Sequence, residues 1–316
     1  MLFPLAPERG NAMDIFDRLE TYRRRVVVLS AAAALVFAAG ILLPAIFGEK
    51  AGAGFVPLFL IGILPSLLLL GLIGGIAFFV HRYKVGFRTG LARAVWSEYC
   101  EGLVYAPERG FPKERLAAAG MILMGNTYRS QGYLSGRHGP LFLETASVSI
   151  KNILLNQKTT ASVTFFDGLW VIITLDRPFS CDMLIREKGF AAAQSLSDTG
   201  RTPLAPVRVE DEEFLGYFRV SASDGEKAAA LLTPTLREAI LSVNRTLMGD
   251  LMFGFFGREL HVALHGWEEP LEPFVLGRFC REEIRDALLT PIRVVAGLME
   301  ALEEEPALFL PPEKSS

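Results

Sequence analysis

His261 and His265 are the residues whose type and spacing come closest to a known chemistry. They form an H-x-x-x-H pattern, which on a helix would place two zinc ligands side by side. However, Leu260, Val262 and Leu264 alternate with the two histidines, as in a strand, and no glutamate lies between them as in zinc proteases. We therefore predict a polar strand face that carries both imidazoles, and no metal site.

Other reactive residues lack the spacing that their chemistry requires. The acidic run Glu210–Glu213 has no calcium-loop glycine, so we interpret it as a solvated turn or a helix start. Cys181 has no C-x-x-C companion, and no G-x-S-x-G, Walker or G-x-G-x-x-G motif occurs. Trp170 lies in an apolar run and is predicted to belong to the core. The sequence therefore predicts no catalytic, cofactor-binding or metal-ligating residue, and no cofactor.

The composition indicates a membrane segment joined to a soluble remainder. Of the 316 residues, 51% are hydrophobic and 21% are charged, with a mean hydropathy of +0.32, which excludes a wholly disordered chain. Residues 85–316 hold 24 basic and 30 acidic residues, and this acidic excess argues against nucleic acid as a partner. The three cysteines are far apart and odd in number, which favours a reducing compartment, most simply the cytosol.

Two uncharged runs are long enough to cross a bilayer. Val26–Phe47 has 22 residues and Phe55–Val80 has 26, whereas a span needs about 20. Only the seven residues Gly48–Gly54 join them, so we predict an antiparallel hairpin. Neither run contains an ionisable residue, which disfavours a transporter or pump.

Basic residues flank the hairpin on its terminal sides. Arg23–Arg25 precede the first span, and Arg82, Lys84 and Arg88 follow the second, whereas the connecting loop holds only Lys50. The positive-inside rule then predicts that both termini are cytoplasmic. Residues 1–25 are predicted to form a cytoplasmic helix, which either extends the first span and packs on the soluble part or lies on the membrane surface.

Small residues and a proline shape the predicted spans. Pro65 falls near the middle of the second span and is predicted to bend it. Gly71 and Gly75 form a G-x-x-x-G pair, which serves either packing within the hairpin or dimerisation.

The rest of the chain combines hairpins with helices. We predict hairpin turns at Gly136–Gly139, at Asp167-Gly168, which is the strongest local signal, and at Gly257-Arg258. Because the hairpins are grouped apart from the helices, the predicted fold class is α+β. The polar segment Gln194–Pro206 is the predicted internal loop.

Helices are predicted on both sides of these hairpins. One continues the second span from Tyr83 to Val104, and a short one starts near Pro112 and carries Leu116–Ala119. Ser223 and Glu226 have the spacing of a capping box, and Thr233-Pro234 is typical of a helix start, with Leu236, Ile240, Val243 and Leu247 facing inward. The last predicted helix, Arg281–Glu305, is kinked or divided at Pro291.

The order of these segments resembles a known family. After the hairpin come GLVYAPERGFPKERLAAAGM, FFDGLWVIITLDRPFSC, EFLGYFRVSASDGEKAAALLTPTLREAIL and GRELHVALHGWEEPLEP. This sequence is similar to the bacterial two-span membrane protein family catalogued as domain of unknown function 3137. The resemblance implies a bacterial inner-membrane location and a cytoplasmic domain, and it implies no activity or catalytic residue.

Together these patterns predict four regions. They are a cytoplasmic N-terminal helix (1–25), a transmembrane hairpin (26–80, with spans 26–47 and 55–80), a cytoplasmic α+β domain (81–304) and a flexible tail (305–316). The predicted function is a membrane-tethered, non-enzymatic module that binds a protein partner or assembles with itself at the inner membrane. The alternatives are a small-molecule or lipid binding domain coupled to the hairpin, or a hydrolase with an unrecognised site.

Overall fold

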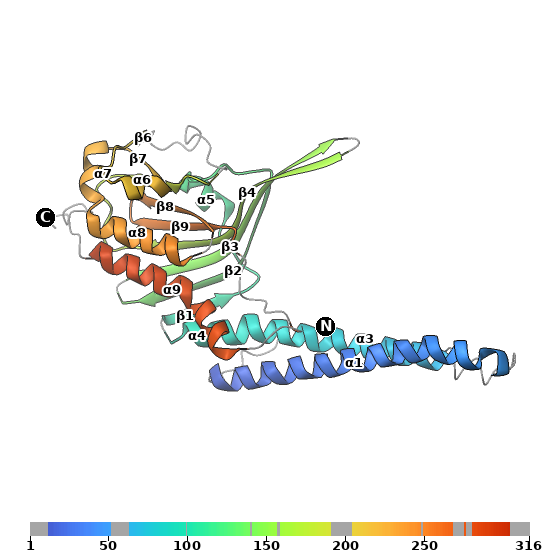
Figure 1. The fold of residues 1–316 in the computed structure, drawn as a ribbon. Coiled ribbons are helices and arrows are strands. Elements are labelled where there is room, and N and C mark those ends of the chain that lie inside the picture. The colour runs from blue at the N-terminus through green and yellow to red at the C-terminus, as the bar shows by residue number, and fades with distance from the viewer. Residues whose placement is uncertain are drawn as a thin grey trace. The chain divides into compact units, whose positions relative to one another are not determined.

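The structure of the chain is a computed structural model that describes residues 12–51, 63–98, 100–139, 141–156, 159–190, 204–247, 249–267, 275 and 280–303 (Figure 1). These residues divide into two compact units. The first takes the described residues up to Val95 together with 275 and 280–285, and the second takes the others from Trp96 onward. Each unit is described by itself. The predicted tail, residues 52–54 of the predicted loop Gly48–Gly54 and residues 194–203 of the predicted loop Gln194–Pro206 lie outside the described residues. Residues 48–51, which were predicted to belong to the loop between the spans, are helical.

Two long apolar helices dominate the first unit. They are α1 (Ala12–Ala51) and α3 (Leu64–Val85), and their segments Met13–Leu42 and Leu64–Val85 are long and apolar enough to cross a membrane. Their large apolar side chains point outward, and Leu35 and Leu70 are 72% and 67% exposed. An apolar surface of this extent is unfavourable in water and is compatible with contact to lipid.

The N-terminal segment is part of the first long helix. Ile15, Phe16 and Leu19 are buried, although they precede the uncharged run. A side-chain methyl of Leu19 lies 3.2 Å from the position that a Cβ atom of Gly86 would take. Gly86 begins the π-helix η2 (Gly86–Leu91), so the extension of the first span packs against the end of the second within this unit.

Pro65 and Gly75 were both predicted to shape the second apolar helix. Pro65 lies in the first turn of α3. Its predicted position near the middle of the second span is not tested, because residues 55–62 lie outside the described residues. Gly75 faces α1, with the Leu29 side chain 3.4 Å from where its Cβ would be, whereas nothing lies that close to Gly71. Gly75 therefore serves packing within the helix pair.

The helix predicted from Tyr83 to Val104 is too long. After η2, α4 (Ala92–Trp96) ends the helical segment, and Glu101–Ala106 forms strand β1. Gly102 has a φ of +61° within this strand, where the register against β2 shifts. The shift is typical of a bulge that uses the conformational freedom of glycine.

Within the described residues, nine antiparallel strands form one sheet, which confirms the α+β class. Their order is β1-β2-β3-β4-β9-β8-β5-β7-β6. The other bounds are β2 (Thr127–His138), β3 (Leu141–Asn156), β4 (Thr159–Thr174), β5 (Met183–Glu187), β6 (Ala205–Pro206), β7 (Phe218–Ala222), β8 (Asp250–Phe256) and β9 (Glu259–His265).

The helices of this unit begin at recognisable caps. They are α5 (Lys113–Ala119), α6 (Glu212–Tyr217), α7 (Gly225–Leu231), α8 (Pro234–Thr246) and the helix α9 (Arg281–Glu303), which begins in the first unit and is continuous through Pro291. Thr233 caps α8 as predicted, accepting from the Leu236 N–H at 3.3 Å. The cap of α7 is Asp224, one residue after the predicted Ser223, because its carboxylate accepts from the Lys227 N–H.

Different helices cover the two faces of the sheet. Leu116 of α5 belongs to a buried cluster with Met252 of β8. Phe214 of α6 packs on Phe218, whose ring lies 6.2 Å from that of Phe253. Met252 and Phe253 are neighbours on one strand, so their side chains point to opposite faces. We call the face that carries Met252 the α5 face.

Two of the three predicted hairpin turns are misplaced. The turn at Gly257-Arg258 is confirmed between β8 and β9. The turn predicted at Gly136–Gly139 lies later, because β2 and β3 remain paired as far as His138 and Leu141. No turn occurs at Asp167-Gly168, where β4 runs straight through.

A glycine is needed at position 168 because the backbone of β9 lies so close to it, and not because the chain turns there. It pairs with Val148 of β3 on one side and with His265 on the other. A Cβ atom at this position would overlap the carbonyl oxygen of Leu264. The residue therefore permits a close approach of two backbones.

Candidate functional site

Arg115 joins two carboxylates on the α5 face. Its guanidinium donates two hydrogen bonds to Glu144 of β3, at 2.9 and 2.6 Å, and one to Glu259 of β9 at 2.8 Å. The Glu144 side chain is only 8% exposed. A planar guanidinium matches a carboxylate in this bidentate way, and such charged hydrogen bonds are stronger than neutral ones. Arg115 thus fastens α5 to the strands on both sides of β4.

His261 and Tyr133 extend these contacts. His261 is buried, its Nε2 lies 3.1 Å from the Glu259 carboxylate, and its Nδ1 accepts from the indole of Trp170 at 3.3 Å. Since an indole can only donate, Nε2 is the protonated nitrogen and donates to Glu259. The Tyr133 hydroxyl donates to Glu144 at 2.7 Å. We call this set the Arg115 network: Arg115, Tyr133, Glu144, Trp170, Glu259 and His261.

These hydrogen bonds set the charge states of the network. The bond from His261, reinforced by Arg115, lowers the pKa of Glu259 from 4.5 to about 2. The bonds to Glu144 and Glu259 raise the pKa of Arg115, and burial raises that of Tyr133. Glu259 is therefore ionised at neutral pH, and its low pKa makes it a poor general base. The arrangement suits the holding of α5 on the sheet better than proton transfer.

The prediction of a polar strand face for both histidines is wrong for His261. The alternation along β9 holds, but the face that carries His261 and Ala263 is the α5 face, in the buried core. Two hydrogen bonds compensate the burial of the imidazole. His265, at the end of the strand, is half-buried, and its Nδ1 accepts from the Asp167 N–H at 3.0 Å.

The remaining residues with reactive side chains occupy structural positions. Cys100 and Cys181 are buried free thiols, and burial raises both pKa values, that of Cys181 to about 11. Both thiols are thus protonated and unreactive at neutral pH. Asp211 of the acidic run caps α6, which confirms the predicted helix start. Among the described residues, no group of three or more His, Cys, Asp or Glu side chains could hold a metal ion.

Strands β3 and β4 continue beyond the rest of the sheet (Figure 1). The pairing of β2 with β3 ends at Lys151, and that of β9 with β4 ends at Gly168. From there β3 and β4 pair only with each other, out to Asn156 and Thr159. We call residues 152–156 and 159–164 the arm. A ribbon of two strands has no core of its own and is marginally stable when isolated.

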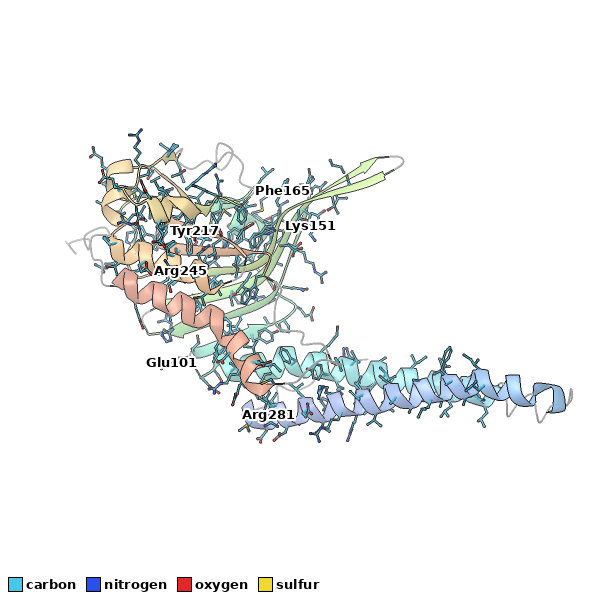
Figure 2. The ribbon with its side chains drawn as sticks, in the orientation of Figure 1. Glu101, Lys151, Phe165, Tyr217, Arg245 and Arg281 are labelled. Carbon is cyan, nitrogen blue, oxygen red and sulfur yellow. The ribbon has the colours of Figure 1, made fainter. Side chains whose placement is uncertain are left out.

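The base of the arm is fixed on both sides. Lys151 forms an ion pair with Asp167 at 2.8 Å, and the register shifts by one residue at Phe165. Figure 2 labels Lys151 and Phe165 near the start of the arm. The amide of Asn126 binds both backbone groups of Ile153 at the outer edge of β3. These contacts connect the base of the arm to the rest of the second unit.

Apolar side chains continue the α5 face onto the arm, where they become exposed. Val148 and Ile150 of β3 are buried in the core, whereas Leu154 on the same strand face is 56% exposed. Val163, which pairs with Asn152, is 49% exposed. Leu154 and Val163 are diagonal neighbours on one face of the ribbon, so together they form an exposed apolar patch.

Part of the chain matches the model of a known protein family. The family model described as a protein of unknown function, DUF3137, matches residues 164–304. The predicted family resemblance is confirmed. The matched region begins at Thr164 of β4 and includes β5–β9 and α6–α9, and with them Trp170, Glu259 and His261 of the Arg115 network.

No curated protein matches the sequence. A search of solved structures found the crystal structure of the mycobacterial trehalose monomycolate transport factor A, TtfA. It has 10% sequence identity, covers 75% of this chain and 98% of that chain, and has a TM-score of 0.38. A likeness this distant carries no inference about this chain.

Proposed function

We propose that this chain is a membrane-tethered, non-enzymatic module that uses its arm to bind a protein partner or a second copy of itself. In this proposal both apolar helices cross the bacterial inner membrane, and both termini and the sheet lie in the cytoplasm. The basic residues on the terminal sides of the helix pair support this orientation.

The exposed arm is the observation that carries the proposal. An apolar patch on a ribbon that extends beyond its neighbouring strands is costly in water. Beyond Ile153, whose backbone groups bind Asn126, the ribbon can offer both side chains and backbone groups to a partner. Its position as a direct continuation of the α5 face means that an added strand or helix would extend an existing core. The Arg115 network supports a non-enzymatic role, because its carboxylates are engaged by internal donors.

Site-specific photocrosslinking in cells tests the proposal. A photoreactive amino acid replaces Leu154 in one variant and Val163 in another. The matched control carries it at Tyr217 of α6, which is also 49% exposed but lies outside the arm (Figure 2). We expect crosslinked products from both arm positions and not from Tyr217.

The mass of the product separates the two kinds of partner. A band at twice the mass of the 34.7 kDa chain identifies self-assembly, and mass spectrometry of any other band identifies a protein partner. Equal crosslinking from the arm and from Tyr217, or none from the arm, would contradict the proposal.

A further inference from the structure

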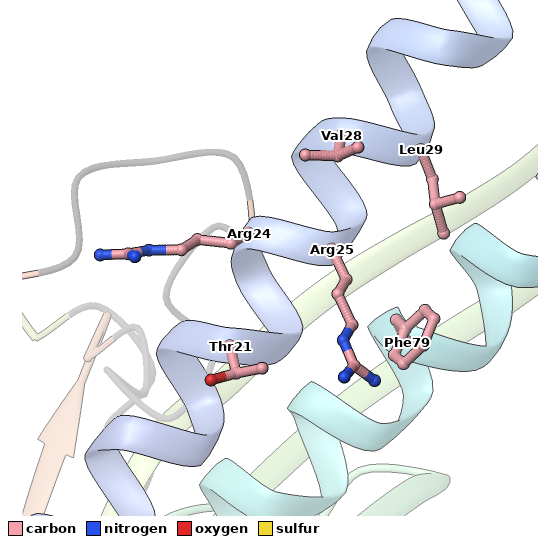
Figure 3. Close-up of a pocket in the computed structure, with 6 residues that line it drawn as sticks. All are labelled: Thr21, Arg24, Arg25, Val28, Leu29 and Phe79. Atoms are coloured by element: carbon pink, nitrogen blue, oxygen red, sulfur yellow. The ribbon is translucent and has the colours of Figure 1, made fainter.

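We propose that the groove between α1 and α3 binds an anionic phospholipid, with the phosphate at Arg25 and an acyl chain along Val28 and Leu29. The inference goes beyond the proposed function and does not depend on the arm. The groove has a volume of about 550 Å³ and is lined by Thr21, Arg24, Arg25, Val28, Leu29 and Phe79 (Figure 3).

Along α1, the lining of the groove changes from charged to apolar side chains, which matches the headgroup and the acyl chain of a phospholipid. Arg24 and Arg25 lie at its charged end, and Val28 and Leu29 lie about one helical turn further on, inside the uncharged run. A soluble anion would use only the charged end, and a lipid without a phosphate would not engage the guanidinium of Arg25. A molecule with a phosphate and a hydrocarbon chain satisfies both ends.

Arg25 is the residue best placed to hold the phosphate. Figure 3 shows its guanidinium directed from α1 toward Phe79 of α3, and the guanidinium carbon lies 5.2 Å from the ring centroid. A cation–π contact at this distance places the guanidinium beside the groove without using its N–H groups, which can then donate to phosphate oxygens. Arg24 extends to the other side of α1 and forms an exposed i,i+4 pair with Glu20 at 3.0 Å, so it contributes charge at longer range.

Aromatic residues mark the same level of the helix pair as a membrane boundary. Arg82 of α3 lies over Phe78 at 5.4 Å, and the ring of Tyr22 on α1 lies 6.2 Å from that of Phe79. Aromatic and basic residues gather at the level of lipid headgroups, where one end of the side chain is apolar and the other polar. The groove therefore lies where phosphates of a bilayer would be.

Native mass spectrometry of the full chain in detergent tests this inference. The probes are phosphatidylglycerol and phosphatidylcholine with identical acyl chains. Both headgroups contain a phosphate, but only phosphatidylglycerol carries a net negative charge. We expect the chain to retain phosphatidylglycerol, and Arg25→Gln to weaken that binding about fivefold. Arg25→Lys keeps the positive charge but cannot bind a phosphate in a bidentate way, so it should weaken phosphatidylglycerol binding by an intermediate amount.

Arg93→Gln is the matched control, because Arg93 is exposed on α4 and does not line the groove. This variant should bind phosphatidylglycerol like the unmodified chain. Equal retention of the two lipids by the unmodified chain would overturn the proposal, and so would unchanged binding by Arg25→Gln. Displacement of the lipid by millimolar inorganic phosphate would show a soluble-anion site and would overturn it as well. If Arg25→Gln does not fold, the comparison of the two lipids on the unmodified chain decides alone.

Discussion

The α-carbon of Gly168 on β4 lies so close to Leu264 on β9 that a Cβ atom on the glycine would overlap the leucine carbonyl oxygen. The obstacle is backbone in the centre of the sheet, where β9 is in turn paired with β8. A side chain at position 168 therefore requires that two central strands separate.

Every substitution of Gly168 should destabilise the fold, because the clash arises at Cβ. We expect Gly168→Ala and Gly168→Asn to lower the free energy of unfolding by about 1–3 kcal/mol each. The measurement is urea unfolding of the purified chain in detergent. Gly216→Ala is the control, because Gly216 lies in helix α6 with nothing near its Cβ position, and alanine there should be neutral or stabilising. A stable Gly168→Asn variant beside a destabilised Gly168→Ala variant would contradict the clash at Cβ and would favour a turn at this position.

The Arg115 network should be a main source of stability for the attachment of α5. Arg115→Ala leaves the buried carboxylate of Glu144 without its cation, and we expect a loss of about 3–5 kcal/mol in unfolding free energy. Arg115→Lys cannot form the bidentate contact and should recover only part of it.

Arg245 supplies the control for this measurement. It also contacts two carboxylates, Glu213 and Glu238, but on an exposed surface (Figure 2). Arg245→Ala should change the unfolding free energy by less than about 1 kcal/mol. Similar losses for both arginines would mean that the network does not hold α5.

Acid should weaken the fold through Glu259. Its pKa is lowered from 4.5 to about 2 in the folded chain, so its contribution is complete above about pH 4.5 and is lost as the pH falls toward 2. Because 34% of the side chain is exposed, screening limits this contribution to about 1–2 kcal/mol.

Glu259→Gln removes the titrating group and should flatten the decline of stability between pH 4.5 and pH 2. Thermal unfolding across this range, compared with the unmodified chain, measures the difference. An equally steep decline in both proteins would assign the acid sensitivity to other carboxylates.

Reporter fusions test the predicted orientation of the helix pair. Alkaline phosphatase, which is active only outside the cytoplasm, should be inactive when fused after Ser316 and active when inserted after Lys50. The basic residues on the terminal sides are the physical reason, because they resist transfer across the membrane. The reverse pattern of activity would invert the topology.

Local signals were sufficient for several elements of the fold. The uncharged runs, the Thr233-Pro234 cap of α8 and the glycine turn at Gly257 each depend on contacts within a few residues, and each is found in the structure. The predicted turn at Asp167-Gly168 was wrong, because the dipeptide that favours a turn also fits a strand whose neighbouring strand approaches closely. Only the partner strand, nearly 100 residues later, distinguishes the two cases.

The Arg115 network was missed for a similar reason. Glu144 follows the apolar residues Leu141–Leu143 on a strand, and a carboxylate at such a position signals a buried partner. The sequence does not indicate that Arg115, 29 residues earlier, supplies it, nor that the face carrying His261 is covered by α5. Both contacts can be predicted only when it is known that β3, β4 and β9 are neighbours in the sheet.

The pairing of β4 with β9 also dictates an order of events during synthesis. Residues 159–174 leave the ribosome long before residues 259–265, which are their partners in the finished sheet. Until then the apolar edge of β4 lacks its neighbour, since contacts so distant in sequence form late. The two apolar helices at the start of the chain emerge well before that point. In the proposed membrane topology, the polypeptide is therefore anchored at its helix pair while its sheet is still open.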